Sequence, residues 1–312
     1  MTASRLLITG GSGLLALNWA CAMRGRAEVV LAPHHRHVVL RGARSEALDL
    51  DDPHALARAV ARIAPALVVH TAGLTSVDAC ERDPVAARHA NVTIAANVAA
   101  AAAACGARLV HISTDHLFAG TQALCAEDEP PAPLNVYAQT KLEAEQEVLR
   151  LAPDALVVRT NFFGWGHRYR QSFSDWIIAS LEAGRPLTLF DDVWFTPTLC
   201  DVVATAVTDL LAAGARGVCN VVGDERVSKF GFAQKLAQAF DLPGQLIVRG
   251  KLATALLAAP RPRDMSLDNA RTRATLGRSL GTVDDALIAL RAQDRGGRRA
   301  ELLAAVTAAV TA

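Results

Sequence analysis

Residues 9–16, which read TGGSGLLA, decide the fold predicted for this 312-residue chain. They follow a strand-like run, Arg5–Thr9, and open a helix expected at 14–24. Gly10 permits a tight turn, and Gly13 lets the backbone approach a pyrophosphate group that the helix N-terminus attracts. Such a turn can be merely structural, but its place between a strand and a helix favours a dinucleotide-binding loop.

Apolar runs alternate with helix-like stretches through the first half of the chain. Further strands are expected at 28–32, 66–70, 108–112 and 155–159, and helices at 53–63, 85–105 and 136–151. Short apolar runs separated by helices predict a parallel sheet covered on both faces. We therefore predict an α/β fold: a doubly wound Rossmann domain over 1–160 that also receives part of 185–222, and a smaller substrate-binding lobe formed mainly by 161–312.

Composition and charge argue against several kinds of partner. The net charge is +1, with 32 basic and 31 acidic residues, which gives no reason to expect nucleic acid. None of the six cysteines forms a CxxC pair, which disfavours a zinc or redox site. The N-terminus lacks a signal-peptide pattern, and the most apolar window, 92–112, contains Asn97 and Arg108 and so resembles a buried helix and strand. We expect a cytoplasmic protein without a metal site or a membrane partner.

The end of the second strand bears on the choice of cofactor. An NAD-binding fold often has an acidic residue there, which holds the ribose hydroxyls. Here the strand leads into Pro33-His34-His35-Arg36, and no acid is present. Arg36 is either a partner for a 2′-phosphate or a solvated loop residue. The sequence therefore favours NADP, with NAD as the alternative.

Tyr137 and Lys141 lie four residues apart on an expected helix, so both project from one face. A phenol has a pKa of about 10 and is a poor acid at neutral pH, but a nearby ammonium group lowers that pKa. Such a tyrosine can give its proton to a carbonyl oxygen while a hydride arrives from a nicotinamide. A hydroxyl pair, Ser113-Thr114, ends the preceding strand, where ligands bind in doubly wound sheets, and either hydroxyl could hold the carbonyl.

The chain resembles the extended short-chain dehydrogenases/reductases, and more narrowly the dTDP-4-dehydrorhamnose reductases. The resemblance spans nearly the whole chain and is most specific in its middle third. It rests on residues 70–81 (HTAGLTSVDACE), Ser113-Thr114-Asp115 with Leu117-Phe118 and Gly120, 131–141 (PAPLNVYAQTK), Arg159-Thr160, Thr196-Pro197-Thr198, and Arg261-Pro262 with Ser266-Leu267-Asp268.

The resemblance implies a role for individual residues. Thr114 would hydrogen-bond the carbonyl, Tyr137 would donate the proton, and Lys141 would support Tyr137 and hold the nicotinamide ribose. With Arg36, the cofactor surface would comprise Gly10, Ser12, Gly13, Leu14, Leu15, Asp49, Leu50, Thr71, Ala72, Gly73, Asn91 and Lys141. The substrates would be nucleotide-linked 4-keto-6-deoxysugars, contacted by Thr75, Asp115, His116, Phe162 and Arg261.

Three positions depart from the pattern of this family. His70 stands where the family usually has asparagine, and His116 stands where it has a tyrosine that contacts the sugar. Phe162 falls near a family tryptophan that stacks on the sugar. These changes spare the hydride chemistry but alter the predicted sugar pocket, so a keto-sugar other than the rhamnose precursor is an open alternative.

Two further functional readings stay open. The regulatory β subunit of methionine adenosyltransferase resembles the same family and keeps a YxxxK motif, so the chain could bind NADP and a partner enzyme without turnover. An epimerase, or a reductase acting on another carbonyl compound, would use the same scaffold. A homodimer is a further expectation.

Overall fold

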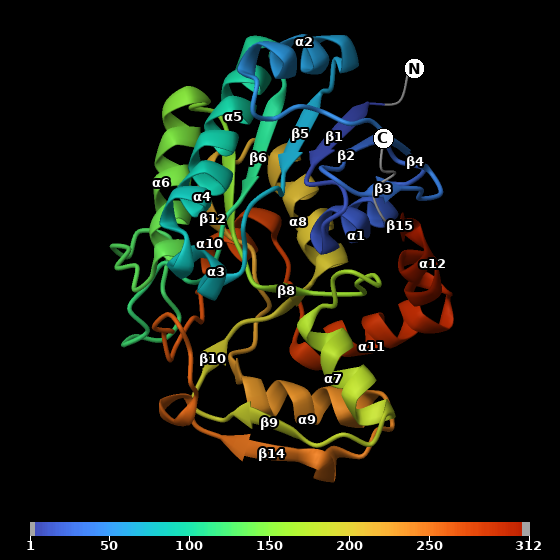
Figure 1. The fold of residues 1–312 in the computed structure, drawn as a ribbon, viewed down its shortest axis with the longest axis vertical. Coiled ribbons are helices and arrows are strands. Elements are labelled where there is room, and N and C mark those ends of the chain that lie inside the picture. The colour runs from blue at the N-terminus through green and yellow to red at the C-terminus, as the bar shows by residue number, and fades with distance from the viewer. Residues whose placement is uncertain (1–3, 308–312) are drawn as a thin grey trace.

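Seven parallel strands form the central sheet of the computed structural model, which describes residues 4–307 (Figure 1). Their spatial order is β12 (Gly217–Asn220), β7 (Leu156–Arg159), β6 (Arg108–Ile112), β5 (Leu67–His70), β1 (Arg5–Thr9), β2 (Glu28–Ala32) and β4 (Ala43–Ser45). The order reverses between β1 and β5, and ligands bind at the carboxyl ends of strands beside such a switch point. The predicted doubly wound α/β fold is confirmed.

Alternate residues of the strands supply two separate hydrophobic cores. In β1, Leu6 and Ile8 belong to one core and Leu7 to the other. The first core includes α1 (Leu14–Met23) and α8 (Cys200–Ala212), and the second includes α2 (Pro53–Ile63), α5 (Ile94–Ala104) and α6 (Val136–Leu151). Because both faces are covered, these strands are continuous apolar runs rather than alternating ones.

The helix expected at 85–105 is more complex than predicted. It consists of α4 (Pro84–Arg88), a π-helical turn His89–Thr93, and α5. A short helix, α3 (Val77–Arg82), precedes it and was not predicted. The π-turn buries Asn91, so the wider turn serves to direct a polar side chain inward.

The second lobe lies below the sheet in Figure 1 and contains several short paired strands. Its elements are β8 (Phe162–Phe163), α7 (Phe173–Glu182), β9 (Leu187–Phe190), β10 (Trp194–Phe195), β11 (Thr198–Leu199), β13 (Val227–Ser228), α9 (Lys229–Ala239), β14 (Ile247–Gly250) and α11 (Val283–Arg295). Strand β9 pairs with β14, β10 with β13, and β8 with β11.

The chain returns to the sheet-bearing lobe twice. Helix α8 packs on α1, and β12 joins the sheet beside β7, both from the segment predicted to return. Later, α10 (Ala270–Leu276) contacts β12, α12 (Arg298–Ala305) follows α11, and β15 (Val306–Thr307) pairs with β3 (His37–Val38). The two lobes are therefore interwoven along the chain, and their division into domains stays a prediction.

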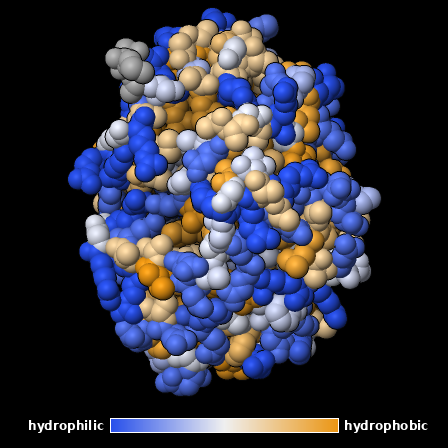
Figure 2. Space-filling model, turned by 180° about the vertical axis from the view of Figure 1, so that it is seen from behind, coloured by the Kyte–Doolittle hydropathy of each residue, from blue (hydrophilic) through white to orange (hydrophobic). Residues whose placement is uncertain are grey.

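The face turned away in Figure 1 is seen in Figure 2, where hydrophilic side chains are abundant and hydrophobic ones form separate patches. Among residues 4–307, no helix is both long enough and apolar enough to cross a bilayer. Within the same residues, no cluster of three or more histidine, cysteine, aspartate or glutamate side chains has the geometry of a metal site.

Candidate active site

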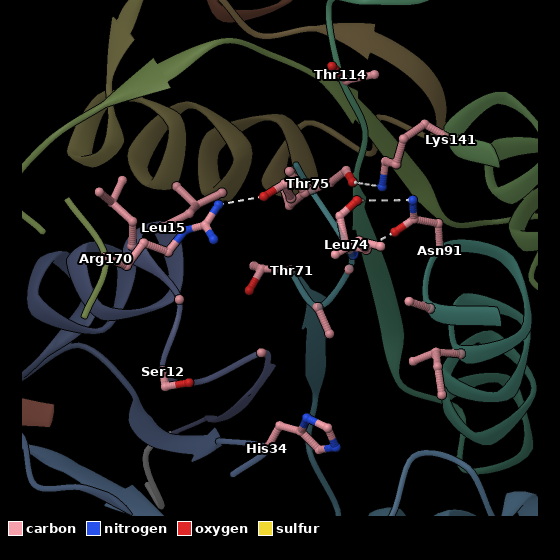
Figure 3. A pocket seen from close by; sticks show the side chains of 18 of the residues that line it. Ser12, Leu15, His34, Thr71, Leu74, Thr75, Asn91, Thr114, Lys141 and Arg170 are labelled. Carbon is pink, nitrogen blue, oxygen red and sulfur yellow. Dashed lines mark hydrogen bonds between the residues drawn. The ribbon is translucent and has the colours of Figure 1, made fainter. Parts of the chain in front are cut away.

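One cavity of about 810 Å³ opens at the carboxyl ends of β1, β5 and β6. It is lined by every residue predicted for cofactor, catalysis or substrate except Arg261. The carboxyl ends of parallel strands meet at one edge of the sheet, which explains how segments so far apart in sequence share this cavity. Figure 3 shows part of its lining, with Ser12 and His34 at one end and Thr114 and Lys141 at the other.

The glycine loop after β1 forms one end of the cavity. Gly10 has a φ of +69°, and a Cβ atom on it would lie 2.7 Å from the backbone nitrogen of Ala72. Only glycine fits both conditions. Gly13 is the N-cap of α1, and this helix has neither a side-chain cap nor an acidic residue in its first turn. The positive end of α1 is therefore available to an anion in the cavity.

Arg36 and Asp49 also line the cavity. The guanidinium of Arg36 stacks over the ring of Tyr169, with its Cζ atom 4.0 Å from the ring centroid. Asp49 instead accepts hydrogen bonds from the backbone amides of Asp51 and Asp52. The carboxylate therefore stabilises its own turn, while Arg36 is held in place without an ion pair in the described part of the chain.

Asn91 fixes the loop that follows β5. Its Oδ1 atom accepts from the amide of Leu74 at 2.8 Å, and its Nδ2 atom donates to the Leu74 carbonyl and to Thr140 Oγ1. A Cβ on Gly73 would lie 2.9 Å from Asn91 Oδ1, so a larger residue here would have to displace the Asn91 side chain from its hydrogen bonds. The π-turn, this loop and α6 are thus locked together, and Thr71, Ala72 and Thr75 are presented to the cavity.

Lys141 is buried, and its ammonium group points at the end of β6. It donates to the carbonyl oxygen of Ile112 at 2.7 Å and lies 3.3 Å from Nε2 of His111. Burial lowers the pKa of Lys141 to about 8, and the carboxylate of Glu145 opposes this lowering. Burial also holds the pKa of His111 well below its usual value, so its neutral imidazole accepts from the ammonium.

Tyr137 lies one turn before Lys141, and its side chain is also buried. Burial raises the pKa of the Tyr137 phenol to about 12, and a hydrogen bond with Thr114 only partly opposes this rise. The sequence led us to expect that Lys141 lowers this pKa. That expectation is wrong for this structure, because loss of hydration outweighs nearby charge and the ammonium is engaged by Ile112 and His111.

The predicted sugar-facing residues surround Tyr137. The ring of His116 meets that of Tyr137 edge to face, with centroids 5.6 Å apart. The Nδ1 atom of His116 is buried and has no hydrogen-bond partner within residues 4–307. Burial lowers the pKa of His116, so the imidazole is neutral. Asp115 accepts from Asn161 Nδ2 at 2.6 Å and is held by the end of β7, while Phe162 lines the cavity from β8.

Arg261 is the one predicted site residue that the structure keeps out of the cavity lining. Its guanidinium pairs with Asp78 at 2.8 Å and also donates to the carbonyl of Ala259. The ion pair joins the loop before α10 to the start of α3. Arg261 therefore joins the second lobe to the first, and its substrate contact stays a prediction.

Two groups of residues were missed in the sequence. The first is the pairing of His70, noted above for its identity alone, with His111 on the neighbouring strand; their rings stack 5.4 Å apart, and His111 contacts Lys141. Their register across β5 and β6 places them together, which a single sequence does not reveal. The second is the turn 167–170, which lines the cavity with His167, Tyr169 and Arg170. It follows no motif, and only its run of basic and aromatic residues could have drawn attention.

The comparison with family models matches the RmlD substrate binding domain over residues 4–294. The chain belongs to this family. The resemblance to the dTDP-4-dehydrorhamnose reductases is thereby confirmed.

Curated relatives share about a third of their residues with the chain. A probable low-salt glycan biosynthesis reductase of Haloferax volcanii is 31% identical over 290 residues, covering 91% of this chain and 96% of the relative. A dTDP-4-dehydrorhamnose reductase of Mycobacterium tuberculosis is 32% identical, covering 83% and 82%. The β subunit of methionine adenosyltransferase 2 of Pongo abelii is also 32% identical, covering 88% and 82%.

A solved structure supports the fold independently. The dTDP-4-dehydrorhamnose reductase of Bacillus anthracis, determined in complex with NADP, superposes with a TM-score of 0.83 and 23% identity. The match covers 94% of this chain and all of that one. Agreement over both lobes shows that the second lobe, as well as the sheet, follows the family architecture.

Proposed function

We propose that the protein uses NADPH to reduce a keto group on a nucleotide-linked deoxysugar, with Tyr137 as the proton donor. The observation that carries the proposal is a single cavity that joins the glycine loop to Thr114, Tyr137 and Lys141. A hydride donor held by the loop and a proton donor on α6 could then act on one carbonyl group from two sides.

Two relatives that match most of the chain are named reductases, and the superposed reductase carries NADP. As far as the class of enzyme and the type of cofactor are concerned, the predictions of an NAD(P)-dependent oxidoreductase and of NADP are confirmed. The sugar, the individual catalytic roles and the preference for NADPH are proposals.

The cavity fits a dinucleotide. Gly10 leaves the space that a Cβ would fill, and the uncapped N-terminus of α1 offers backbone amides to a pyrophosphate. Arg36 would meet the 2′-phosphate, and Lys141 would hold the nicotinamide ribose. When bound, the reduced nicotinamide supplies the hydride.

The raised pKa of Tyr137 suits a reductase. With a pKa of about 12, the phenol keeps its proton at neutral pH, which is the form that a proton donor needs. Thr114 would hydrogen-bond the carbonyl oxygen and orient it toward the phenol. A phenolate remains after the proton moves from Tyr137 to that oxygen. Lys141, whose ammonium is bound by the Ile112 carbonyl, would contribute by holding the nicotinamide ribose and not by lowering the pKa of the phenol.

His116 and Phe162 are the residues that would determine which sugar binds. The neutral imidazole of His116 offers one donor or acceptor to a sugar hydroxyl beside Tyr137, where a tyrosine would offer a longer phenol. Phe162 offers a smaller stacking surface than tryptophan. A nucleotide-linked keto-deoxysugar other than the rhamnose precursor therefore suits the pocket.

A panel of nucleotide-linked 4-keto sugars tests the proposal. We expect NADPH oxidation with at least one member, and formation of the corresponding alcohol by mass spectrometry. Oxidation that yields no reduced sugar, or no oxidation with any member, would contradict it.

A binding role is the second candidate, because the methionine adenosyltransferase β subunit is as similar as the reductases. In that case NADP would raise the melting temperature, while no nucleotide sugar would raise it further, since only a ligand of the folded state stabilises it. An epimerase would instead interconvert sugars without net NADPH loss. Cytoplasmic location and a homodimer stay predictions.

A further inference from the structure

The turn 167–170 reaches from the second lobe across the cavity and touches the first lobe at three points. Nε2 of His167 is 2.9 Å from the backbone oxygen of Ser12 in the glycine loop. The ring of Tyr169 lies under Arg36. Arg170 donates to the hydroxyl of Thr75, as Figure 3 shows.

The turn is held in shape from its base. The backbones of His167 and Arg170 exchange two hydrogen bonds of 3.0 and 2.9 Å, which closes a two-residue loop. Gly166 before it donates to Asp175 of α7 at 2.6 Å, and a Cβ on Gly166 would lie 2.3 Å from the Arg170 carbonyl oxygen. The position of Arg170 is therefore set by the backbone before any ligand arrives.

The guanidinium of Arg170 lacks an anionic partner. Among residues 4–307 its one side-chain hydrogen bond is to Thr75, and none of the ion pairs of these residues includes it. The side chain nevertheless lines the cavity, as does Leu15 in the first turn of α1. An uncapped helix N-terminus and an unpaired arginine thus face the same space from two lobes.

We propose that Arg170 is a diphosphate-binding residue that closes over a ligand held at the N-terminus of α1. A guanidinium suits this role, because its planar donors pair with two phosphate oxygens at once. The neutral hydroxyl of Thr75 holds the side chain ready and is easily exchanged for a charged acceptor. The inference rests on the proposed function for the presence of such ligands, which carry a diphosphate as cofactor and as substrate.

The test is calorimetric titration of the full-length protein with two probes. NADPH carries the diphosphate of the cofactor, and dTDP, added to NADP-saturated protein, carries that of a nucleotide sugar. For Arg170→Gln we expect the dissociation constant of one probe to rise roughly 10- to 100-fold, as for loss of a hydrogen bond to a charged group. A rise for NADPH assigns the arginine to the cofactor, and a rise for dTDP assigns it to the substrate.

The matched control is Arg168→Gln. Arg168 lies in the same turn and, like Arg170, is exposed, but it donates to the carbonyl of Leu303 and does not line the cavity. The Arg168→Gln substitution removes the same positive charge as Arg170→Gln, so a general electrostatic effect on ligand binding would appear in both variants. Arg170→Lys should recover part of the affinity, because the charge remains while the paired donors are lost.

The result that overturns the inference is clear. If Arg170→Gln binds both probes within about two-fold of the wild type, or loses no more affinity than Arg168→Gln, Arg170 is not a diphosphate ligand. Melting temperatures of all variants without ligand show whether the turn still folds. Because binding is measured without turnover, failure of the proposed reductase activity would leave this result intact.

Discussion

The two walls of the cavity differ in how they are built and in what they encode. One wall, formed by β1, β5, β6 and α6, carries the glycine loop, Thr114, Tyr137 and Lys141. The opposite wall, formed by 160–170, carries Phe162, Tyr169 and Arg170 on loops and a two-residue strand. Regular elements fix the groups that any such reductase needs, whereas the loops offer the positions at which the bound molecule can be changed.

The largest effect should come from the first wall. Lys141→Met keeps the length of the side chain but removes the ammonium, so the nicotinamide ribose would lose its proposed anchor and the Ile112 carbonyl loses its donor. We expect kcat/KM to fall at least about 100-fold. Lys251→Met, at an exposed lysine paired with Asp191, is the control and should keep wild-type kinetics. An unchanged kcat/KM for Lys141→Met would contradict the claim that the first wall carries the groups needed for the reaction.

Next in size is the contact between the walls at Arg36. In Arg36→Gln the stack on Tyr169 and the proposed 2′-phosphate contact are both lost. We expect the dissociation constant of NADPH to rise about ten-fold or more and that of NADH to change little. Arg41→Gln, at a highly exposed arginine of the same lobe, is the matched control. If the dissociation constants of NADPH and NADH rise equally, Arg36 does not bind the 2′-phosphate.

A smaller effect is expected where His116 faces Tyr137. His116→Tyr restores the side chain of the family, and we expect the ratio of kcat/KM between dTDP-4-dehydrorhamnose and the best other sugar to rise about ten-fold. The affinity for NADPH should stay the same, because His116 belongs to the sugar end of the cavity. A ratio that does not move would show that the sugar is selected elsewhere.

The smallest effect is a pH dependence. Burial lowers the pKa of Lys141 to about 8, so its side chain is a protonated ammonium below that pH and a neutral amine above it. Tyr137 stays protonated up to about pH 12. We expect kcat/KM to decline above pH 8. Lys229→Met is the control, because burial also lowers the pKa of Lys229 to about 8. If the decline in kcat/KM above pH 8 disappears in Lys229→Met, it is caused by Lys229 and not by Lys141.

The sequence predicted the first wall almost completely. Local signals suffice there, because a strand, a glycine turn and a helix are adjacent in the chain and Tyr137 and Lys141 share one helix face. The buried pair His70 and His111 escaped prediction, since its members meet only through the pairing of β5 with β6. The turn 167–170 escaped for a similar reason, because its partners lie about a hundred residues or more away.

The pKa of one residue and the ion-pair partner of another could not be read from the sequence. Lys141 does not lower the pKa of Tyr137, because burial of the phenol outweighs the charge, and burial cannot be read from a four-residue spacing. Arg261 does not line the cavity, because Asp78 offers it a carboxylate partner at 2.8 Å. A motif identifies the residue types, and only the packing around them determines their charge and their partner.

The central claim is that reduction at this cavity proceeds through Tyr137, and Tyr137→Phe tests it most directly. The variant removes one hydroxyl and keeps the ring that packs against His116. With a substrate from the sugar panel, the account predicts a loss of kcat of roughly 100- to 10,000-fold and an unchanged dissociation constant for NADPH. Turnover at the wild-type rate by Tyr137→Phe would contradict it.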